Sequence, residues 1–362
     1  MVEGVIPRGA HCRTPLTRRR TTSLIVAIVA IVAIVGALSA CSSASPSMLD
    51  GKSPQADRIS DLWWLMFALA VAVYVTVIAF VIVAAMRRRR SPGPDTSSAS
   101  GVSLRGDLLD DRVDRRFLLY GGLLLPVIVL GIIAVQTVRV SDSLQAATAR
   151  VHIDVDAKDW WWRISYPNDG VVTANEIHVP VGESVQIALR SDNVVHSLWV
   201  PQLNGKSDVI PGETNYMTFI AAQTGIFRGQ CAEFCGIEHA KMAFIVIVQT
   251  RADFEAWLAS SRTPGVAAQT AQQRQGAQLV ATTSCAGCHT IIGTAAIGTV
   301  GPDLTHVGSR QTLASDSLPN TPDGMVRWLT ATQQVKAGAL MPQIDLTAAQ
   351  VAAITAYLES LK

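Results

Sequence analysis

The sequence carries little charge: Asp, Glu, Lys and Arg make up 16% of its 362 residues, whereas a typical soluble domain has about 25%. Hydrophobic residues make up 49%, with no long run of glycine or proline. This composition excludes a disordered or fibrous chain and indicates contact with lipid. The formal net charge is only +2, so a dense basic stripe is missing and no nucleic-acid partner is expected.

Cysteine is also scarce. Two cysteines lie in the N-terminal segment and four form two close pairs, which makes six in all: Cys12, Cys41, Cys231, Cys235, Cys285 and Cys288. A distributed disulfide framework would need more cysteines at wider spacing. Close pairs in an exported chain indicate metal or haem chemistry instead.

Residues 1–40 are predicted to be a lipoprotein-type signal peptide. Basic residues up to Arg20 are followed by the apolar run Leu24–Leu38 and by small residues before Cys41, which is the order of an export signal. The Leu-Ser-Ala-Cys ending resembles the bacterial lipoprotein box, in which the cysteine becomes the lipidated first residue of the mature chain. We therefore expect lipidation at Cys41. The alternative is an ordinary signal, or a membrane helix that happens to end in cysteine.

Two further apolar runs, 62–86 and 117–139, each have the ~20 residues that a helix needs to cross a ~30 Å hydrocarbon core. The loop between them, 87–116, holds eight arginines, whereas the segment 41–61 holds one lysine and one arginine. Positively charged loops favour the cytoplasmic side. The loop is therefore predicted to be cytoplasmic, with the segment 41–61 and everything after the second run outside.

Short runs that alternate apolar and polar residues fill the region 145–250, separated by turn residues. Period-two alternation is typical of strands. A series of such runs over about 100 residues predicts an antiparallel β-sandwich or barrel.

The chemistry of this domain is concentrated in its last loop. Cys231, Cys235, His239 and Met242 have the spacing C-x3-C-x3-H-x2-M, and His196 lies at the end of an earlier predicted strand. Thiolate, imidazole and thioether are soft ligands that favour copper over hard cations. Two thiolates can bridge two copper ions, and each histidine can complete one ion. The alternatives are a disulfide and a structural zinc site, although zinc has no use for methionine.

Three motifs resemble subunit II of the haem-copper cytochrome c oxidases. They are Val195–Pro201, Lys206–Gly212 and Gly229–Met242, and the last is highly specific. The resemblance covers the two apolar runs and the β domain. It implies a cupredoxin-like fold that holds a dinuclear copper centre, CuA.

The resemblance also implies a role for each ligand. Cys231 and Cys235 bridge the two copper ions, and His196 and His239 each bind one ion. Met242 caps one ion, and the backbone carbonyl of Glu233 caps the other. The Glu233 side chain is expected to help hold a magnesium ion at the boundary with subunit I. Trp160, the first of three adjacent tryptophans, is aligned with the residue through which electrons enter the copper centre. Because side chains alternate along a strand, the other two tryptophans are expected to fill its faces.

Residues 251–269 are predicted to form a short helix and a linker, and residues 270–362 a separate domain. This domain contains Cys285-Ala-Gly-Cys288-His289. In an exported protein, C-x-x-C-H indicates covalent attachment of one haem c through two thioethers, with the histidine as an axial iron ligand. A redox-active dithiol is the alternative, but no βαβ pattern surrounds the motif.

The second axial ligand is expected at Met341, Met325 or His306. Met341 precedes Pro342 in a loop before the final predicted helix. This loop resembles the Met-Pro ligand loop of small class I cytochromes c, which have an all-α fold, so we assign Met341. Met325 is expected in the domain core and His306 near the haem edge. A Met/His pair raises the haem potential, which suits electron delivery to copper.

The predicted fold class is a multi-domain membrane protein: a two-helix transmembrane hairpin, a cupredoxin-like antiparallel β-sandwich and an all-α class I cytochrome c domain. The expected function is electron input to a respiratory cytochrome c oxidase, from the fused haem c to CuA and on to haem and copper sites of subunit I. Oxygen reduction to water, coupled to proton translocation, is expected in that partner, because this chain has no multi-helix haem-binding bundle.

The expected partners are subunits I and III in the membrane, with an external cytochrome c or a cytochrome bc complex as electron donor. The expected location is the bacterial cell membrane, multi-pass, with both domains on the outer (periplasmic or extracellular) face. The alternative is a stand-alone membrane-anchored copper and haem electron carrier.

Net charge predicts little attraction between the two outer domains. Residues 151–250 carry six Lys and Arg against eleven Asp and Glu, and residues 265–362 carry five of each. Opposite net charges that would steer one domain onto the other are missing. We therefore expect the linker to keep the domains together, since a short tether gives an effective concentration in the range of about 1 mM.

Overall fold

The structure is a computed structural model that describes residues 46–90, 115–144 and 148–362. Residues Pro46–Lys362 form one compact unit. The predicted signal peptide with Cys41, and most of the predicted cytoplasmic loop, lie outside the described residues. Both therefore remain predictions.

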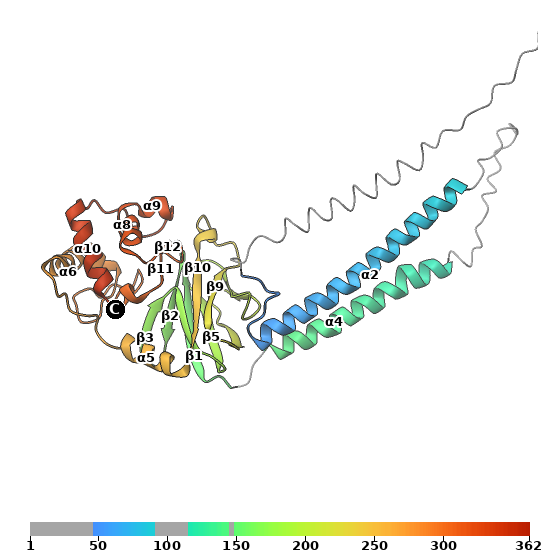
Figure 1. Ribbon diagram of the computed structural model, residues 1–362, viewed down its shortest axis with the longest axis horizontal. Coiled ribbons are helices and arrows are strands. Elements are labelled where there is room, and N and C mark those ends of the chain that lie inside the picture. The colour runs from blue at the N-terminus through green and yellow to red at the C-terminus, as the bar shows by residue number, and fades with distance from the viewer. Residues whose placement is uncertain (1–45, 91–114, 145–147) are drawn as a thin grey trace, which may run out of the picture. The chain divides into compact units, whose positions relative to one another are not determined.

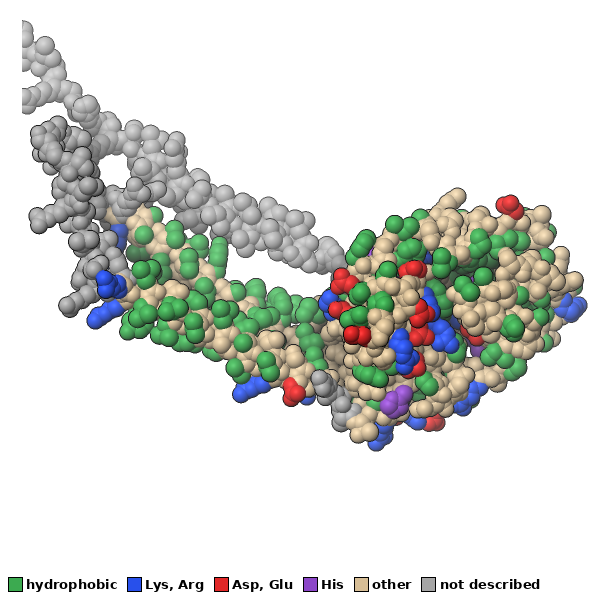
Figure 2. Space-filling model, turned by 180° about the vertical axis from the view of Figure 1, so that it is seen from behind, with side chains coloured by type: hydrophobic (Ala, Val, Ile, Leu, Met, Phe, Trp, Pro, Cys, Tyr) green, Lys and Arg blue, Asp and Glu red, His purple; other side chains and the backbone are tan. Residues whose placement is uncertain are grey.

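Two long apolar helical segments come first. Helix α2 covers Pro54–Arg90, and the second segment consists of the π-helix η1 (Leu118–Leu124) followed by α4 (Leu125–Ser143). The two run antiparallel, because Arg58 donates a hydrogen bond to the Ser143 carbonyl at 2.6 Å while the rings of Phe80 and Phe117 meet near the other ends at 5.9 Å. Figure 2 shows hydrophobic side chains over their described surface. Stretches of 34 and 29 residues are long and apolar enough to cross a membrane.

The π-helix marks a difference from the regular helix that the sequence predicts. Pro126 lies in the first turn of α4. Proline donates no backbone hydrogen bond, and its ring crowds the carbonyl four residues earlier, which belongs to Gly122. The chain widens there into π geometry, a local adjustment that removes this conflict.

A two-layer β-sandwich follows the helices, as predicted (Figure 1). One sheet has the order β3 (Val171–Ala174), β2 (Trp161–Tyr166), β1 (Val151–Lys158), β5 (Ser184–Ser191) and β8 (Asn215–Ile220). The other has the order β4 (Glu176–Pro180), β10 (Ala243–Gln249), β9 (Gly225–Cys231), β6 (His196–Trp199) and β7 (Ser207–Val209). The pairs β1–β5 and β4–β10 are parallel, so both sheets are mixed and not purely antiparallel.

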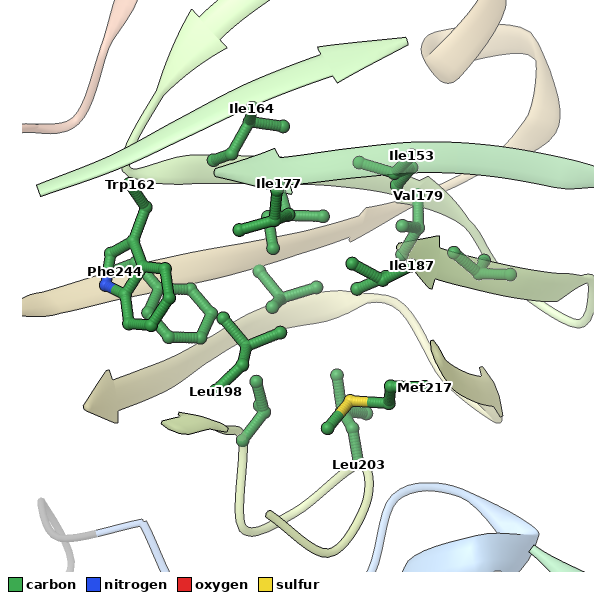
Figure 3. Packing of buried hydrophobic residues seen from close by; sticks show 14 of the residues in the cluster. Ile153, Trp162, Ile164, Ile177, Val179, Ile187, Leu198, Leu203, Met217 and Phe244 are labelled. Atoms are coloured by element: carbon green, nitrogen blue, oxygen red, sulfur yellow. The ribbon is translucent and has the colours of Figure 1, made fainter. Parts of the chain in front are cut away.

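Side-chain alternation builds the core between the sheets. In β1 the buried positions are Val151, Ile153, Val155 and Ala157, because successive side chains point to opposite faces of a strand. Figure 3 shows the inward-facing residues of both sheets in contact. Among them is Trp162, which is fully buried and fills a strand face as expected for one of the three tryptophans.

The segment before α2 is tied to the β domain. The Lys52 amide donates to the Gln202 carbonyl at 2.7 Å, and the Ala222 amide donates to the Lys52 carbonyl at 2.8 Å. Lys52 is thus hydrogen-bonded on both sides by β-domain backbone. This contact fixes the end of the apolar hairpin against the sandwich.

The C-terminal part is helical, with α5 (Arg251–Ser261) leading to α6 (Ala271–Thr282), α7 (Cys285–Cys288), η3 (Val307–Ser309), α8 (Pro322–Thr330), α9 (Thr332–Val335) and α10 (Ala348–Ser360). A small hairpin of β11 (Thr312–Leu313) and β12 (Leu318–Pro319) interrupts it. Helices α6 and α10 cross closely at Gly276, where a Cβ would lie 2.0 Å from the Ala353 carbonyl oxygen. A larger residue at Gly276 would therefore push the two helices apart.

Candidate functional site

Strand ends and one loop bring the predicted copper ligands together. Strand β6 begins at His196 and β9 ends at Cys231. These strands pair, with Leu198 opposite Cys231, so the histidine and the first cysteine reach the same edge of the sheet. The Cys231 amide donates to the Met242 carbonyl at 2.9 Å, which closes the loop that carries the remaining ligands.

Sulfur and nitrogen atoms face one another across this edge. The Sγ atoms of Cys231 and Cys235 lie 3.8 Å apart, and both thiols are free. His196 Nδ1 lies 3.9 Å from Cys231 Sγ, and His239 Nδ1 lies 3.7 Å from Cys235 Sγ. Met242 Sδ lies 3.8 Å from Cys235 Sγ. Each thiol therefore has its own histidine, and the methionine adds a third donor beside Cys235.

The carbonyl oxygen of Glu233 is the corresponding potential metal ligand beside Cys231, 3.2 Å from its Sγ. Its carboxylate forms an ion pair with Lys206 at 3.6 Å. The six predicted ligands thus form two similar halves around the thiol pair. Such a set of soft donors fits a dinuclear copper centre, and a magnesium ion at the Glu233 side chain would have to compete with Lys206.

Hydrogen bonds around the ligands set their protonation. His196 is fully buried, and its Nε2 lies 3.0 Å from Asn193 Oδ1. Because an amide oxygen only accepts, Nε2 carries the hydrogen and Nδ1 is left free to face the thiols. The hydrogen bond between the two thiols lowers the pKa of Cys231 and raises that of Cys235, so Cys231 is the first of the pair to ionise. Nothing in the sequence pattern pointed to Asn193.

A second site lies in the helical domain, where one cavity is lined by Cys285, Cys288, His289 and Met341. His289 Nδ1 lies 2.7 Å from the Pro302 carbonyl oxygen. A carbonyl only accepts, so Nδ1 carries the hydrogen and Nε2 is available to a metal. Burial lowers the pKa of His289, which keeps the imidazole neutral as iron ligation requires. The apolar cavity with two free thiols and a neutral imidazole fits a covalently attached haem.

The three candidates for the second axial ligand lie in different places. Met341 lines the cavity and packs on the domain core. Met325 lines the same cavity but is buried in that core, with 2% of its surface exposed. His306 was expected near the haem edge, and this is wrong, because its Nε2 lies 3.0 Å from the Thr263 carbonyl oxygen and it lines a different, smaller pocket with His178.

Trp160 lies between the two sites. Its indole Nε1 donates to the carbonyl oxygen of Cys235 at 2.8 Å. The same residue lines the cavity that Cys285, His289 and Met341 line. Trp160 is thus bonded to a predicted copper ligand and borders the predicted haem cavity.

Comparisons with known families agree with this arrangement. The family "Cytochrome C oxidase subunit II, periplasmic domain" matches residues 169–250, and the family "Cytochrome c" matches residues 273–362. A solved structure, the periplasmic domain of subunit II of cytochrome oxidase from Bradyrhizobium japonicum, is 29% identical and covers 33% of this chain and 97% of that chain, with a TM-score of 0.32.

Two relatives align over longer stretches. Cytochrome c oxidase subunit 2 of Bacillus sp. (strain PS3) is 31% identical over 258 residues, covering 66% of this chain and 72% of the relative. Cytochrome c oxidase subunit 2 of Alkalihalophilus pseudofirmus is 32% identical over 329 residues, covering 87% of this chain and 90% of the relative. The chain therefore belongs to the cytochrome c oxidase subunit 2 family, with a cytochrome c domain after its β-sandwich.

Proposed function

We propose that this oxidase subunit is the point of electron input, with electrons passing from haem c in the C-terminal domain to a dinuclear CuA centre in the β-sandwich, and on to haem and copper sites in subunit I. The observation that carries the proposal is the position of Trp160. Its indole is hydrogen-bonded to Cys235 at 2.8 Å, and it also lines the haem cavity. One side chain thus borders both redox sites.

The bound groups would supply reversible one-electron chemistry, and the protein's part is to hold and orient them. His196, Cys231, Cys235, His239, Met242 and the Glu233 carbonyl would hold the copper ions. Cys285 and Cys288 would bind the haem covalently, and His289 and Met341 would be the axial iron ligands. Donors held before metal binding need little rearrangement when the charge of the site changes.

Other subunits complete the proposed enzyme. Subunit I would reduce oxygen to water with proton translocation, subunit III would lie beside it, and an external cytochrome c or a cytochrome bc complex would reduce the haem. The copper loop, on which Phe234 is exposed, would lie at the boundary with subunit I. A magnesium ion would bind the Glu233 side chain at this boundary.

We further propose a multi-pass location in a bacterial cell membrane, with both redox domains on the outer face. The two apolar helical segments support it. The arginines between them support it as well, since positively charged loops stay in the cytoplasm.

Isolation of the complex from membranes in mild detergent tests the proposed function. We expect the chain to co-purify with a large haem-containing membrane subunit, and to carry one covalent haem and two copper ions of its own. The covalent haem is measured on the denatured chain and the copper on the isolated subunit. A chain that carries both cofactors but purifies without any partner would support the stand-alone carrier instead.

A further inference from the structure

Lys336 is a buried lysine on the side of the cytochrome domain that faces the β-sandwich. It follows α9 directly, and only 4% of its surface is exposed. Lysine is almost never fully buried without a partner. Burial lowers the pKa of Lys336 to about 7, because the ammonium form loses its hydration here.

All three donors of the Lys336 ammonium find an acceptor. Its Nζ lies 2.5 Å from the Trp160 carbonyl oxygen, 2.9 Å from the Lys241 carbonyl oxygen and 3.0 Å from Ser315 Oγ. The first two acceptors belong to the β-sandwich and the third to the cytochrome domain. The Ser315 hydroxyl in turn donates to the Trp160 carbonyl at 3.0 Å. Lys336 therefore ties two segments of the β-sandwich to its own domain.

A second bond runs in the opposite direction. Lys241 Nζ donates to the Val335 carbonyl at 2.8 Å. The side chain of Lys241 thus bonds to the backbone of the cytochrome domain, and the side chain of Lys336 bonds to the backbone of Lys241. Glu238, which is 4% exposed, pairs with Lys241 at 3.4 Å and brings a negative charge to this contact.

The tied segments adjoin the ligands of both predicted redox sites. Lys241 directly precedes Met242, and Lys336 lies shortly before Met341 in the loop that lines the haem cavity. Between them, Gly338 has a φ of +78°, and a Cβ at this position would lie 2.5 Å from Ile237 Cδ1 of the copper loop. The backbone of the cytochrome domain therefore lies close to the Ile237 side chain of the copper loop.

We propose that Lys336 is a positioning residue for electron transfer, which holds the haem-bearing domain on Trp160 in one fixed arrangement. This inference rests on the proposed function. The step that it positions is the transfer of one electron from ferrous haem, which becomes ferric, to the oxidised copper pair; no bond is formed or broken. Because the docked domain covers part of Trp160, an external donor has to reduce the haem first.

Lys336→Met tests the proposal in the full chain, with Lys362→Met as the matched control. Methionine has a similar length but leaves the Lys241 carbonyl without its donor. An unsatisfied buried acceptor is expected to shift the equilibrium between the docked and undocked domain by about tenfold towards the undocked state. Lys362 lies at an exposed position of the same domain, so its replacement removes the same charge without touching the contact.

The first readout is hydrogen exchange, which does not depend on the cofactors. The amide of Gln311 donates to Glu176 of the β-sandwich at 2.6 Å and therefore reports on docking. In Lys336→Met we expect this amide to exchange about tenfold faster, while amides inside α6 and α10 keep their protection. Unchanged exchange at Gln311 would overturn the proposal. General loss of protection in α6 and α10 would show misfolding. The milder variant Lys336→Gln would then be used, and exchange of its Gln311 amide would be compared with that of the amides in α6 and α10.

The second readout is the rate of haem-to-copper transfer in the assembled oxidase. We expect the rate to fall by up to about tenfold in Lys336→Met, because a tenfold smaller docking equilibrium constant lowers the docked fraction by at most that factor, and to stay unchanged in Lys362→Met, with both cofactor spectra intact. Equal rates in parent and Lys336→Met would overturn the positioning role alone. No haem-to-copper transfer in the parent would instead contradict the proposed function.

Discussion

Replacing Cys231 by serine is expected to abolish the dinuclear copper centre. The two Sγ atoms lie 3.8 Å apart with one histidine beside each, so both thiols are needed to bridge two ions symmetrically. A buried hydroxyl at this position stays protonated and is a hard, weak ligand for copper. Even outer-shell partners contribute about 10- to 100-fold to metal affinity, and we expect the loss here to exceed about 100-fold.

Copper content and electron paramagnetic resonance of the oxidised protein measure this effect. The parent should bind two copper ions that share one unpaired electron, with hyperfine structure from two equivalent nuclei. Met242→Leu is the matched control, because it removes a weak thioether ligand and should keep both ions while shifting the potential. A parent with one ion and a mononuclear spectrum, or with zinc in place of copper, would contradict the assignment.

Replacing Met341 by alanine is expected to remove the second axial ligand of the haem. The sulfur-to-iron absorption of the oxidised spectrum should disappear, and the potential should fall by on the order of 0.1 V, well within the span of about 0.8 V that axial ligands control. The haem should stay attached, because Cys285 and Cys288 are unchanged.

Met325→Ala is the natural comparison, since Met325 lines the same cavity from the buried core. We expect this variant to keep the absorption and the potential while losing about 2–5 kcal/mol of stability, as buried methionine truncations do. If Met325→Ala loses the absorption and Met341→Ala keeps it, the two roles are reversed.

Most of the predicted redox-site residues come from local sequence patterns. The copper loop carries five of the six ligands within one short segment, so their proximity follows from the chain itself. The haem motif is equally local. His196 was a candidate from its place at a predicted strand end, but its approach to Cys231 requires the pairing of β6 with β9, which spacing alone does not specify.

Contacts between distant segments were beyond the reach of the sequence. Lys336 is one lysine in a domain with balanced charge, and nothing in its neighbourhood marks it as buried. From net charge we expected the linker to be the main connection between the domains, whereas the structure also shows specific hydrogen bonds and the ion pair of Arg228 with Asp316 at 2.7 Å. The net charge of a domain is a sum over all its charged side chains, whereas the contact depends on a few individual side chains at hydrogen-bond distance.

Time-resolved absorption of the assembled oxidase tests the central claim, that electrons pass from the fused haem to copper. A short light pulse with a photoreductant reduces the haem, and the haem and copper bands are then followed together. The haem should be reduced first, and its reoxidation should have the same time constant as the reduction of copper. Reduction of copper while the haem stays reduced, or with the haem bypassed, would contradict the account.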